Sequence, residues 1–515
     1  MSACVQVDVM VACTKADFET ATSAVLVLRL AVVKAVLCPR LCQVAVTSLR
    51  HISQHPHIVL PSKRHNVLAI PMKDAPRSQI KHPLYTMPAD DDPLVIAISG
   101  NLVLDIAQED NGPRYSYRVD SKTLQQNSRY FDNLLSDRFR EGQQLSAALE
   151  ALRLSGYSDI AEVSSEVLPH IEIINVGRIA ISKTSAIQNL LADFLRAVHG
   201  FDLAAPNPPV ANLANLAVVA DRFDAVAHLS KYVQRRKYMQ LADVKIKGKP
   251  NPSLTEERIR QKLLVGLLFD HPPWVTRYSK HLIMRDSVQW RPGVEEDHTK
   301  ALWWDLPQGI EDEMIQRREY ILETINSLQA HFLRLYTSGE RQCKLGYDTS
   351  LQCDSFQLGE MVRFFHKIDT VRLQGKIYDN TEPTYYLGDI DRLLLSLRQC
   401  SNYQVDMHHA HCGLRSRLLP LLDFIQNQLS LEAGSLDVSI CLDCWTHHRT
   451  EYAWSVAKRP VLWTLPRSLT GNRTLANGFQ RKGHQRTPSS CLSRHVAIRD
   501  LFMAVDRDWT ARDGF

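Results

Sequence analysis

The sequence lacks the features that mark membrane and secreted proteins. Its most apolar N-terminal stretch, 24–38, is interrupted by Arg29 and Lys34, whereas a bilayer span needs roughly 20 apolar residues. Acidic residues precede this stretch, where a secretion signal would have a basic start. The 11 cysteines are an odd number spread along 515 residues, unlike the dense framework of a small secreted scaffold. We therefore expect no membrane span and an intracellular location, in the cytoplasm or nucleus.

Motifs for catalysis are also missing. The sequence contains no Gly-x-Ser-x-Gly nucleophile elbow, and no spacing of its Asp and Glu residues indicates a paired acid and base. One segment approaches a phosphate-binding loop, Gly177-x-x-x-x-Ser182-Lys183-Thr184, but Ser182 stands where that motif needs glycine. Without that glycine the backbone N–H groups cannot wrap a phosphate. We expect a plain strand-to-helix connection here and no enzymatic activity.

An excess of charge of one sign is absent from most of the chain. The 61 Lys and Arg residues exceed the 56 Asp and Glu residues by only five, and 44% hydrophobic content is typical of a globular protein. Residues 446–515, however, hold 12 Lys or Arg against 5 Asp or Glu. Within them, 472–490 has the composition of a flexible basic loop. Few aromatic residues lie there to stack nucleic-acid bases, so we expect a solvated segment and no nucleic-acid partner.

Residues 1–90 show no sustained period of apolar residues. Prolines, which a helix interior does not tolerate, are scattered through the second half of this stretch, at Pro61, Pro71, Pro76, Pro83 and Pro88. We expect a poorly ordered N-terminal extension.

From residue 92 the pattern predicts strands first and helices after them. An apolar run at 94–100 and an alternating segment at 115–119 predict two strands joined by a loop. Ser121 stands where the N-cap of a following helix is expected. The apolar face of that helix consists of Leu124, Phe131, Leu134 and Leu135. A further strand at 171–176 and helices up to residue 233 complete an α+β region.

This region resembles a BTB/POZ domain of the fungal type. The resemblance is carried by segments 117–124, 128–135, 139–142, 171–176, 194–200 and 220–224, and it extends over about residues 92–240. It implies a compact fold that mediates protein association, often as a homodimer, with no catalytic residues. The chain has Asp120 where many members have His, but Asp can cap the following helix in a similar way.

The resemblance also implies interaction residues. Some members of the family dock a cullin scaffold through a hydrophobic-x-Glu motif, and Phe139-Arg140-Glu141 has that form, although an ordinary loop after a helix is the alternative interpretation. We predict that the apolar helix face joins two copies or a partner. The predicted interaction residues are Leu124, Phe131, Leu134, Leu135, Phe139 and Glu141.

The second half of the chain is predicted to be mostly helical. A basic stretch at 231–249, followed by Pro250 and Pro252, is typical of a domain boundary. Beyond it, leucine-rich stripes with helical spacing predict four amphipathic helices, around 314–335, 358–368, 387–397 and 414–429. Segments 352–360 and 412–420 are similar to the tail segments of the family named above. Leucine-rich stripes with helical spacing are typical of helices that pack together in a core.

A cluster of cysteines and histidines is the one sign of a cofactor. Cys441 and Cys444 have the C-x-x-C spacing that presents two sulfurs to one ion, and His447 follows closely. Cys412 belongs to a second Cys/His-rich stretch about 30 residues earlier. One interpretation is a structural zinc ion held by Cys441, Cys444, His447 and Cys412. The other interpretations are buried cysteines with surface histidines, and a redox-active cysteine pair.

The predicted fold class is an α+β BTB/POZ-like domain followed by a mostly α-helical C-terminal region. The predicted parts are an extension (1–90), the BTB/POZ-like domain (91–245), a helical domain (250–445) and a basic C-terminal segment (446–515). We expect a protein-protein interaction or scaffold protein that self-associates or docks protein partners. The alternatives are a substrate adaptor of a cullin-type ubiquitin ligase and a zinc-bearing nucleic-acid or regulatory binder.

Overall fold

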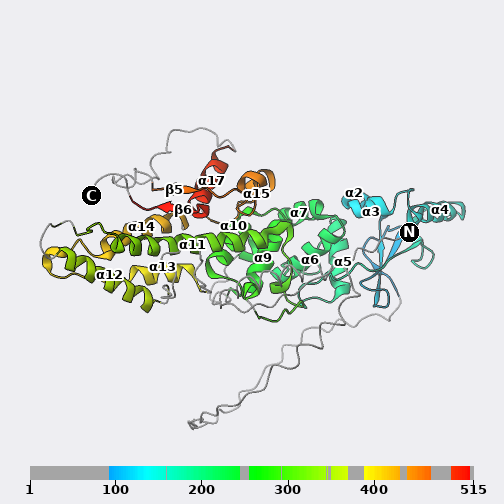
Figure 1. Ribbon diagram of the computed structural model, residues 1–515. Coiled ribbons are helices and arrows are strands. Elements are labelled where there is room, and N and C mark those ends of the chain that lie inside the picture. Colours follow the sequence, from blue (N-terminus) through cyan, green and yellow to red (C-terminus); the bar gives the residue numbers. More distant parts are fainter. Residues whose placement is uncertain are drawn as a thin grey trace, which may run out of the picture. The chain divides into compact units, whose positions relative to one another are not determined.

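The computed structural model describes residues 92–243, 254–345, 350–370, 388–429, 438–465 and 489–510, apart from the single residues 158, 292, 344 and 369. Most of these residues are helical, and a small mixed sheet lies in the N-terminal part (Figure 1). The predicted extension 1–90 lies outside the described residues, as does the predicted basic loop up to residue 488. None of the described helices combines the length and the apolar character that crossing a bilayer requires.

The N-terminal sheet has four strands in the order β1-β3-β2-β4. Their bounds are Leu94–Val95 (β1), Leu102–Ala107 (β2), Arg114–Val119 (β3) and His170–Ile173 (β4). β2 runs antiparallel to β3, with Leu104 opposite Tyr117, and parallel to β4. β2 is buried along almost its whole length because it lies inside the sheet, whereas β4 at the edge alternates exposed and buried side chains.

The first strand of the hairpin is therefore β2 and not the predicted run at 94–100. Within that run only Leu94 and Val95 are paired, and the chain then turns at Gly100. A Cβ atom on Gly100 would lie 2.8 Å from the carbonyl oxygen of Val119, so only glycine fits this close approach. This turn follows β1, so the rest of the apolar run does not continue as a strand.

Within the described residues up to 243, seven α-helices accompany the sheet. They are α2 (Ser121–Asn127), α3 (Arg129–Leu134), α4 (Arg140–Leu154), α5 (Ile187–Val198), α6 (Val210–Arg222), α7 (Val226–Arg235) and α8 (Tyr238–Asp243). The predicted helix after β3 is two helices, because Ser128 adopts an extended conformation and caps α3. The N-cap of α2 is Asp120, not Ser121, and its carboxylate accepts a hydrogen bond from the backbone N–H of Thr123 at 2.8 Å.

The remaining helices form the larger part of the structure. They are α9 (Glu256–Leu268), α10 (Pro272–Arg285), α11 (Ile310–Thr337), α12 (Ser350–Lys367), α13 (Ile390–Arg398), α14 (Leu414–Leu429), α15 (Leu442–His447), α16 (Arg449–Tyr452) and α17 (Ser489–Met503). A short parallel pair, β5 (Leu462–Thr464) and β6 (Asp506–Asp508), completes it. The four predicted amphipathic helices correspond to α11, α12, α13 and α14, although Leu387 lies outside the described residues.

Short 3₁₀ turns connect several of these elements, at Ile160–Glu162, Val288–Trp290, Ala301–Trp303, Pro307–Gly309 and Met407–His409. The core is continuous along the described chain: one hydrophobic cluster includes residues from Ile96 to Trp509. α6 packs against α9, and so the elements on either side of the predicted boundary near residue 245 share this core.

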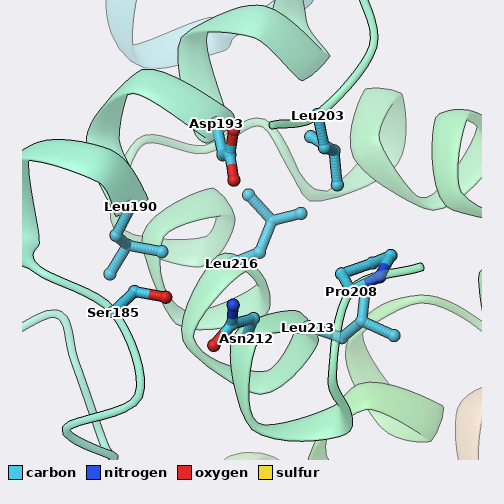
Figure 2. A pocket seen from close by; sticks show the side chains of 8 residues that line it. All are labelled: Ser185, Leu190, Asp193, Leu203, Pro208, Asn212, Leu213 and Leu216. Atoms are coloured by element: carbon cyan, nitrogen blue, oxygen red, sulfur yellow. The ribbon is translucent and has the colours of Figure 1, made fainter. Parts of the chain in front are cut away.

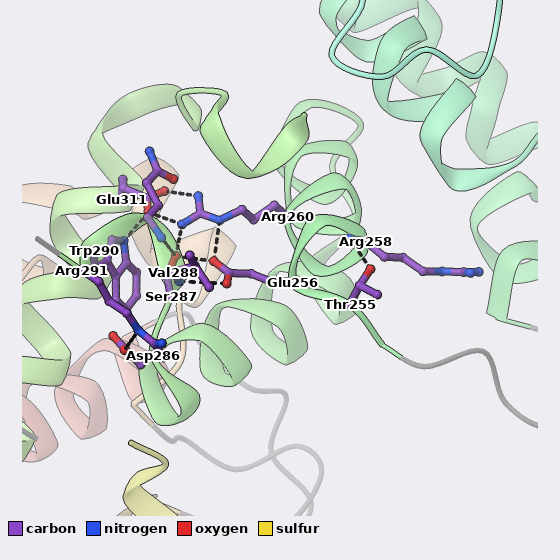
Figure 3. Close-up of polar contacts among 11 residues, drawn as sticks. Thr255, Glu256, Arg258, Arg260, Asp286, Ser287, Val288, Trp290, Arg291 and Glu311 are labelled. Atoms are coloured by element: carbon purple, nitrogen blue, oxygen red, sulfur yellow. Dashed lines mark hydrogen bonds and ion pairs between the residues drawn. The ribbon is translucent and has the colours of Figure 1, made fainter. Parts of the chain in front are cut away.

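Buried arginines connect α11 to its neighbours, Arg260 and Arg317 among them. Arg260 of α9 donates hydrogen bonds to Glu311 at 2.6 and 2.9 Å and to the hydroxyl of Ser287 at 2.7 Å (Figure 3). Arg317 of α11 pairs with Glu313 and donates to the carbonyl oxygen of Ser439 at 2.7 Å. Because a buried charge is costly without partners, these networks fix the positions of the segments that they join.

Candidate metal centres

Among the described residues, two groups of cysteine and histidine side chains converge closely enough to hold a metal ion. The first group, which we name the first centre, consists of Cys343, Cys353, His409 and Cys412, and all four residues are buried. Their ligand atoms all lie within 4.8 Å of one another. Cys343 follows the C-terminal end of α11, Cys353 lies in the first turn of α12, and His409 and Cys412 precede α14. The first centre therefore joins three helices.

The distances in the first centre match a tetrahedral site. Zinc–sulfur bonds of about 2.3 Å and zinc–nitrogen bonds of about 2.0 Å place two sulfurs about 3.8 Å apart, and a sulfur and a nitrogen about 3.5 Å apart. The Sγ atoms of Cys343 and Cys412 are 3.7 Å apart, and the Sγ of Cys343 lies 3.4 Å from Nδ1 of His409. A disulfide would require about 2.05 Å. The described cysteines are all free thiols.

Neighbouring polar groups hold these ligands in place. The carboxylate of Asp354 accepts hydrogen bonds from the backbone N–H groups of Gln342 and Cys343, at 2.8 and 2.9 Å. The hydroxyl of Tyr336, near the end of α11, donates to the carbonyl oxygen of Cys412 at 2.8 Å. Nε2 of His409 lies 3.8 Å from Asp406, so the ring presents Nδ1 to the thiols. Such supporting contacts orient metal ligands in proteins.

The second group, which we name the second centre, consists of Cys441, Cys444, Cys491 and His495. Cys441 is the N-cap of α15 and Cys444 lies in its first turn. Cys491 and His495 are four residues apart on α17, so both side chains project from one face of the helix. The Sγ of Cys491 is 4.0 Å from that of Cys441 and 3.8 Å from that of Cys444. These distances again match the tetrahedral edge.

Tyr452 supports the second centre from α16. Its hydroxyl accepts a hydrogen bond from the backbone N–H of Cys441 at 2.8 Å, and its ring meets the ring of His495 edge to face at 5.1 Å. The guanidinium of Arg317 donates to the same hydroxyl at 3.2 Å. The network around α11 therefore extends to the backbone that carries the first cysteine of the second centre.

Burial opposes ionisation of most of these thiols. It raises the pKa of Cys353 and of Cys412 in the first centre, and of Cys444 and of Cys491 in the second. Burial also opposes ionisation of Cys343, but hydrogen bonds, with Ser350 first among them, outweigh it and lower the pKa of that thiol. A metal ion would displace the thiol protons, because thiolate is the form that binds metal.

The structure separates the four residues predicted as zinc ligands. Cys441 and Cys444 lie together in the second centre, whereas Cys412 belongs to the first. His447 is in neither group: its side chain is 66% exposed, with Nε2 4.0 Å from a carboxylate oxygen of Asp443. His447 is the last residue of α15, and its ring lies on the solvent side beside Asp443, one turn earlier on the same helix.

Five members of the two centres are not among the predicted ligands: Cys343, Cys353, His409, Cys491 and His495. Of these, His409 lies in the Cys/His-rich stretch before α14 that also contains Cys412. Signals for three of these residues exist in the sequence as short-spaced pairs, His409-x-x-Cys412 and Cys491-x-x-x-His495, whereas Cys343 and Cys353 lie ten residues apart and form no such pair. Each pair supplies half of a site, and spacing alone does not say which halves meet.

The predicted interaction residues fall into two sets. Leu124, Phe131 and Leu135 are buried within their own chain, where the ring of Phe131 stacks on that of Phe223 at 5.4 Å. Leu134 and Glu141 are partly buried, and Phe139, the N-cap of α4, is 49% exposed. Of these six residues, Phe139 offers the largest apolar surface for a partner.

The segment that approaches a phosphate-binding loop is a packed connection. Ile179 and Ile181 are buried in the core. The backbone N–H groups of Ile181 and Ser182 already donate to the side-chain oxygen of Asn215, at 2.9 and 3.2 Å. The neighbouring cavity, lined by Asn212 and residues around it, has a volume of only about 10 Å³ (Figure 2). That volume holds about one water molecule, so a nucleotide does not fit.

No protein-family model, curated protein or solved structure matches this chain. A functional assignment therefore depends on the chemistry of the two centres themselves.

Proposed function

We propose that the chain is a zinc-binding scaffold protein in which each centre holds one structural zinc ion. The observation that carries the proposal is the convergence, twice in one chain, of three thiols and one imidazole at tetrahedral distances. A zinc ion with four protein ligands has no position left for a substrate, which is the mark of a structural site. The proposed function therefore includes no catalytic step.

The donor set favours zinc over other metals. Thiolate and imidazole are soft and borderline ligands, which disfavours Mg²⁺ and Ca²⁺. A tetrahedral arrangement of three sulfurs and one nitrogen is a common zinc set. Burial alone does not account for the arrangement, because a cysteine that serves only as a small apolar residue needs no partner sulfur. Cys400, which is buried and belongs to neither centre, is such a residue.

The proposed ions would stabilise two connections between helices. The first centre connects the end of α11 with α12 and the start of α14. The second connects α15 with α17, two elements that are separated in the sequence by the undescribed residues 466–488. Tyr336 contacts the first centre, and Arg317 reaches the second through Tyr452, so α11 is the common support of both.

Metal analysis of the purified full-length chain tests this proposal. We expect two zinc ions per chain, and one in each of the single variants Cys353→Ser and Cys444→Ser. The matched control is Cys400→Ser, which removes a buried thiol outside both centres and should leave two ions. A folded chain that contains no zinc after purification with zinc in the medium would contradict the proposal.

We also propose that residues 92–243 mediate protein association. The support is the resemblance to BTB/POZ domains, together with the presence of a strand hairpin, the helices α2, α3 and α4, a further strand and then more helices. Phe139, exposed at the start of α4 and followed by Glu141, is the feature that favours a docking role. Self-association is the main form of this proposal, and docking to a cullin is the alternative.

Light scattering on the full-length chain at two concentrations tests self-association, for which a dimer is expected. A pull-down with a cullin N-terminal domain tests the alternative. There, Phe139→Ala should abolish capture, whereas Arg138→Ala, which changes an exposed neighbour, should not. A monomer at both concentrations that captures no cullin would contradict both forms of the proposal.

A further inference from the structure

The two centres differ in how exposed their cysteine residues are. No residue of the first centre is more than 8% exposed. In the second centre Cys444 is 1% exposed, but Cys441 and Cys491 are both partly exposed. Oxidants attack thiolates that they can reach, and a bound zinc ion keeps its cysteines in the thiolate form. The same set of ligands, three cysteines and one histidine, is therefore protected from oxidants in the first centre and open to them in the second.

We infer that the second centre is a redox-responsive zinc site, which hydrogen peroxide empties while the first centre keeps its ion. This inference rests on the proposed zinc binding. Peroxide first oxidises one exposed thiolate: a sulfur–oxygen bond forms, the oxygen–oxygen bond breaks, and the departing hydroxide takes up a proton to become water. The thiolate of the other exposed cysteine then attacks the sulfur of this sulfenic acid: a disulfide bond forms, the sulfur–oxygen bond breaks, and the departing hydroxide takes up a proton to become a second water. Peroxide is reduced by two electrons and Zn²⁺ is released.

The geometry selects Cys441 and Cys491 as the pair that closes. Their sulfurs are 4.0 Å apart, so each needs to move by only about 1 Å to reach the disulfide length of about 2.05 Å. Cys491 lies in the first turn of α17, where a helix end frays readily and permits such a movement. The sulfur of Cys444 is nearer to Cys491, at 3.8 Å, but the residue is buried and peroxide reaches its neighbours first.

The disulfide would keep α17 attached after the ion has left. Cys491 would remain linked to the start of α15, while Cys444 and His495 would lose the metal. The far end of α17 has its own contacts: the ring of Phe502 stacks on that of Trp454 at 5.8 Å. Trp509, just beyond β6, donates to the hydroxyl of Ser327 at 3.1 Å. The centre would therefore release zinc without unfolding the chain.

The test uses the full-length chain loaded with zinc, treated with hydrogen peroxide in the presence of a chromophoric zinc indicator. We expect release of one of the two zinc ions per chain and a disulfide between Cys441 and Cys491 in peptide mass spectra. The far-ultraviolet circular dichroism should not change. The variant Cys491→Ser should begin with one ion and release none, whereas Cys400→Ser should behave as the unmodified chain. Reduction followed by added zinc should restore two ions.

The outcomes separate the inference from the proposal on which it depends. A chain without zinc before treatment would overturn the proposed function and this inference together. A chain that holds two ions and releases both, or neither, would overturn the inference alone. A disulfide confined to Cys441 and Cys444, or one within the first centre, would likewise overturn it.

Discussion

Arg260 carries a full charge in an environment that excludes water. Its side chain is 1% exposed, and its guanidinium is surrounded by Glu311, Glu256 and Ser287. The indole N–H of Trp290 donates to the same Glu311 carboxylate, so one change at Arg260 would leave two carboxylates short of a partner (Figure 3). Removing one partner of a buried ion pair is costly, because the other partner keeps a buried charge without a counter-charge.

We therefore expect Arg260→Ala to lower the free energy of unfolding by about 3 to 5 kcal/mol, measured by urea denaturation. Arg258→Ala is the matched control, because the Arg258 side chain extends away from the network (Figure 3). That change should cost no more than about 0.5 kcal/mol. Equal effects of the two substitutions would show that the network does not stabilise the fold.

The buried ring of His331 in α11 makes the stability of the fold depend on pH. Burial, and then the nearby Arg334, lower the pKa of His331 to about 4 from its ordinary value of 6.5. The folded chain thus holds this ring neutral at a pH where the unfolded chain protonates it. Stability associated with His331 is complete above pH 6.5 and is lost as the pH falls from 6.5 towards 4.

The variant His331→Gln should reduce the loss of thermal stability as the pH falls from about 6.5 to about 4.5, because it removes this buried titrating ring. His298→Gln, at a site where the side chain is 64% exposed, should leave the pH profile unchanged. Melting temperatures at several pH values check both. Identical profiles for His331→Gln and the unmodified chain would argue against a role for this ring.

At the scale of elements, capping decides where α2 and α3 begin. Asp120 accepts from the backbone N–H of Thr123, and Ser128 accepts from that of Phe131 at 3.2 Å. The apolar spacing of Leu124 and Leu134 alone predicts one continuous helix. This spacing does not show that Ser128 leaves the helical conformation. The hydroxyl of Ser128 donates to the carbonyl oxygen of Phe223, which is far along the chain, at 2.6 Å.

Replacing the cap tests its contribution to stability. Asp120→Ala should lower the free energy of unfolding by about 1 kcal/mol, whereas Asp120→Asn should retain most of the stability because its amide oxygen can still accept the bond. Lys122→Ala, on the exposed side of α2, is the control and should have little effect. Thermal or urea unfolding distinguishes these cases. If Asp120→Ala left the free energy of unfolding unchanged, tertiary packing alone would hold the start of α2 in place.

At the scale of the whole molecule, the proposed zinc ions and the packed core stabilise the same helices. The first centre lies at the end of α11, and the aromatic contacts of Trp454 and Phe502 lie against its earlier turns. A ligand that binds only the folded state stabilises it more strongly the more tightly it binds. The metal contribution should therefore appear in the unfolding of the entire chain.

Removal of zinc with a strong chelator should lower the melting temperature of the chain by several degrees and increase binding of a hydrophobic dye. Added zinc should reverse both changes, whereas added magnesium should not, because Mg²⁺ prefers oxygen ligands. Scanning fluorimetry provides the measurement. An unchanged melting temperature after complete loss of metal would mean that the packed core alone stabilises the chain and that the metal does not contribute.

The sequence by itself determined the helices with strong apolar periodicity and the half-sites for metal. The stripes in α5, α11 and α14 arise from a 3.6-residue repeat, which is local information. The pairs Cys441 with Cys444 and Cys491 with His495 each lie within about one helical turn, so spacing alone brings their side chains to one place.

Only the tertiary structure decided which half-sites meet. Nearness in sequence favoured His447 and Cys412 as partners of Cys441 and Cys444, yet the structure brings Cys491 and His495 to them, with Cys491 47 residues beyond Cys444. Packing of α17 against α11 and α16 selects this arrangement, because buried apolar area depends on the whole fold and not on spacing along the chain. The same core buried Leu124 and Phe131, which the sequence presented as a surface for partners.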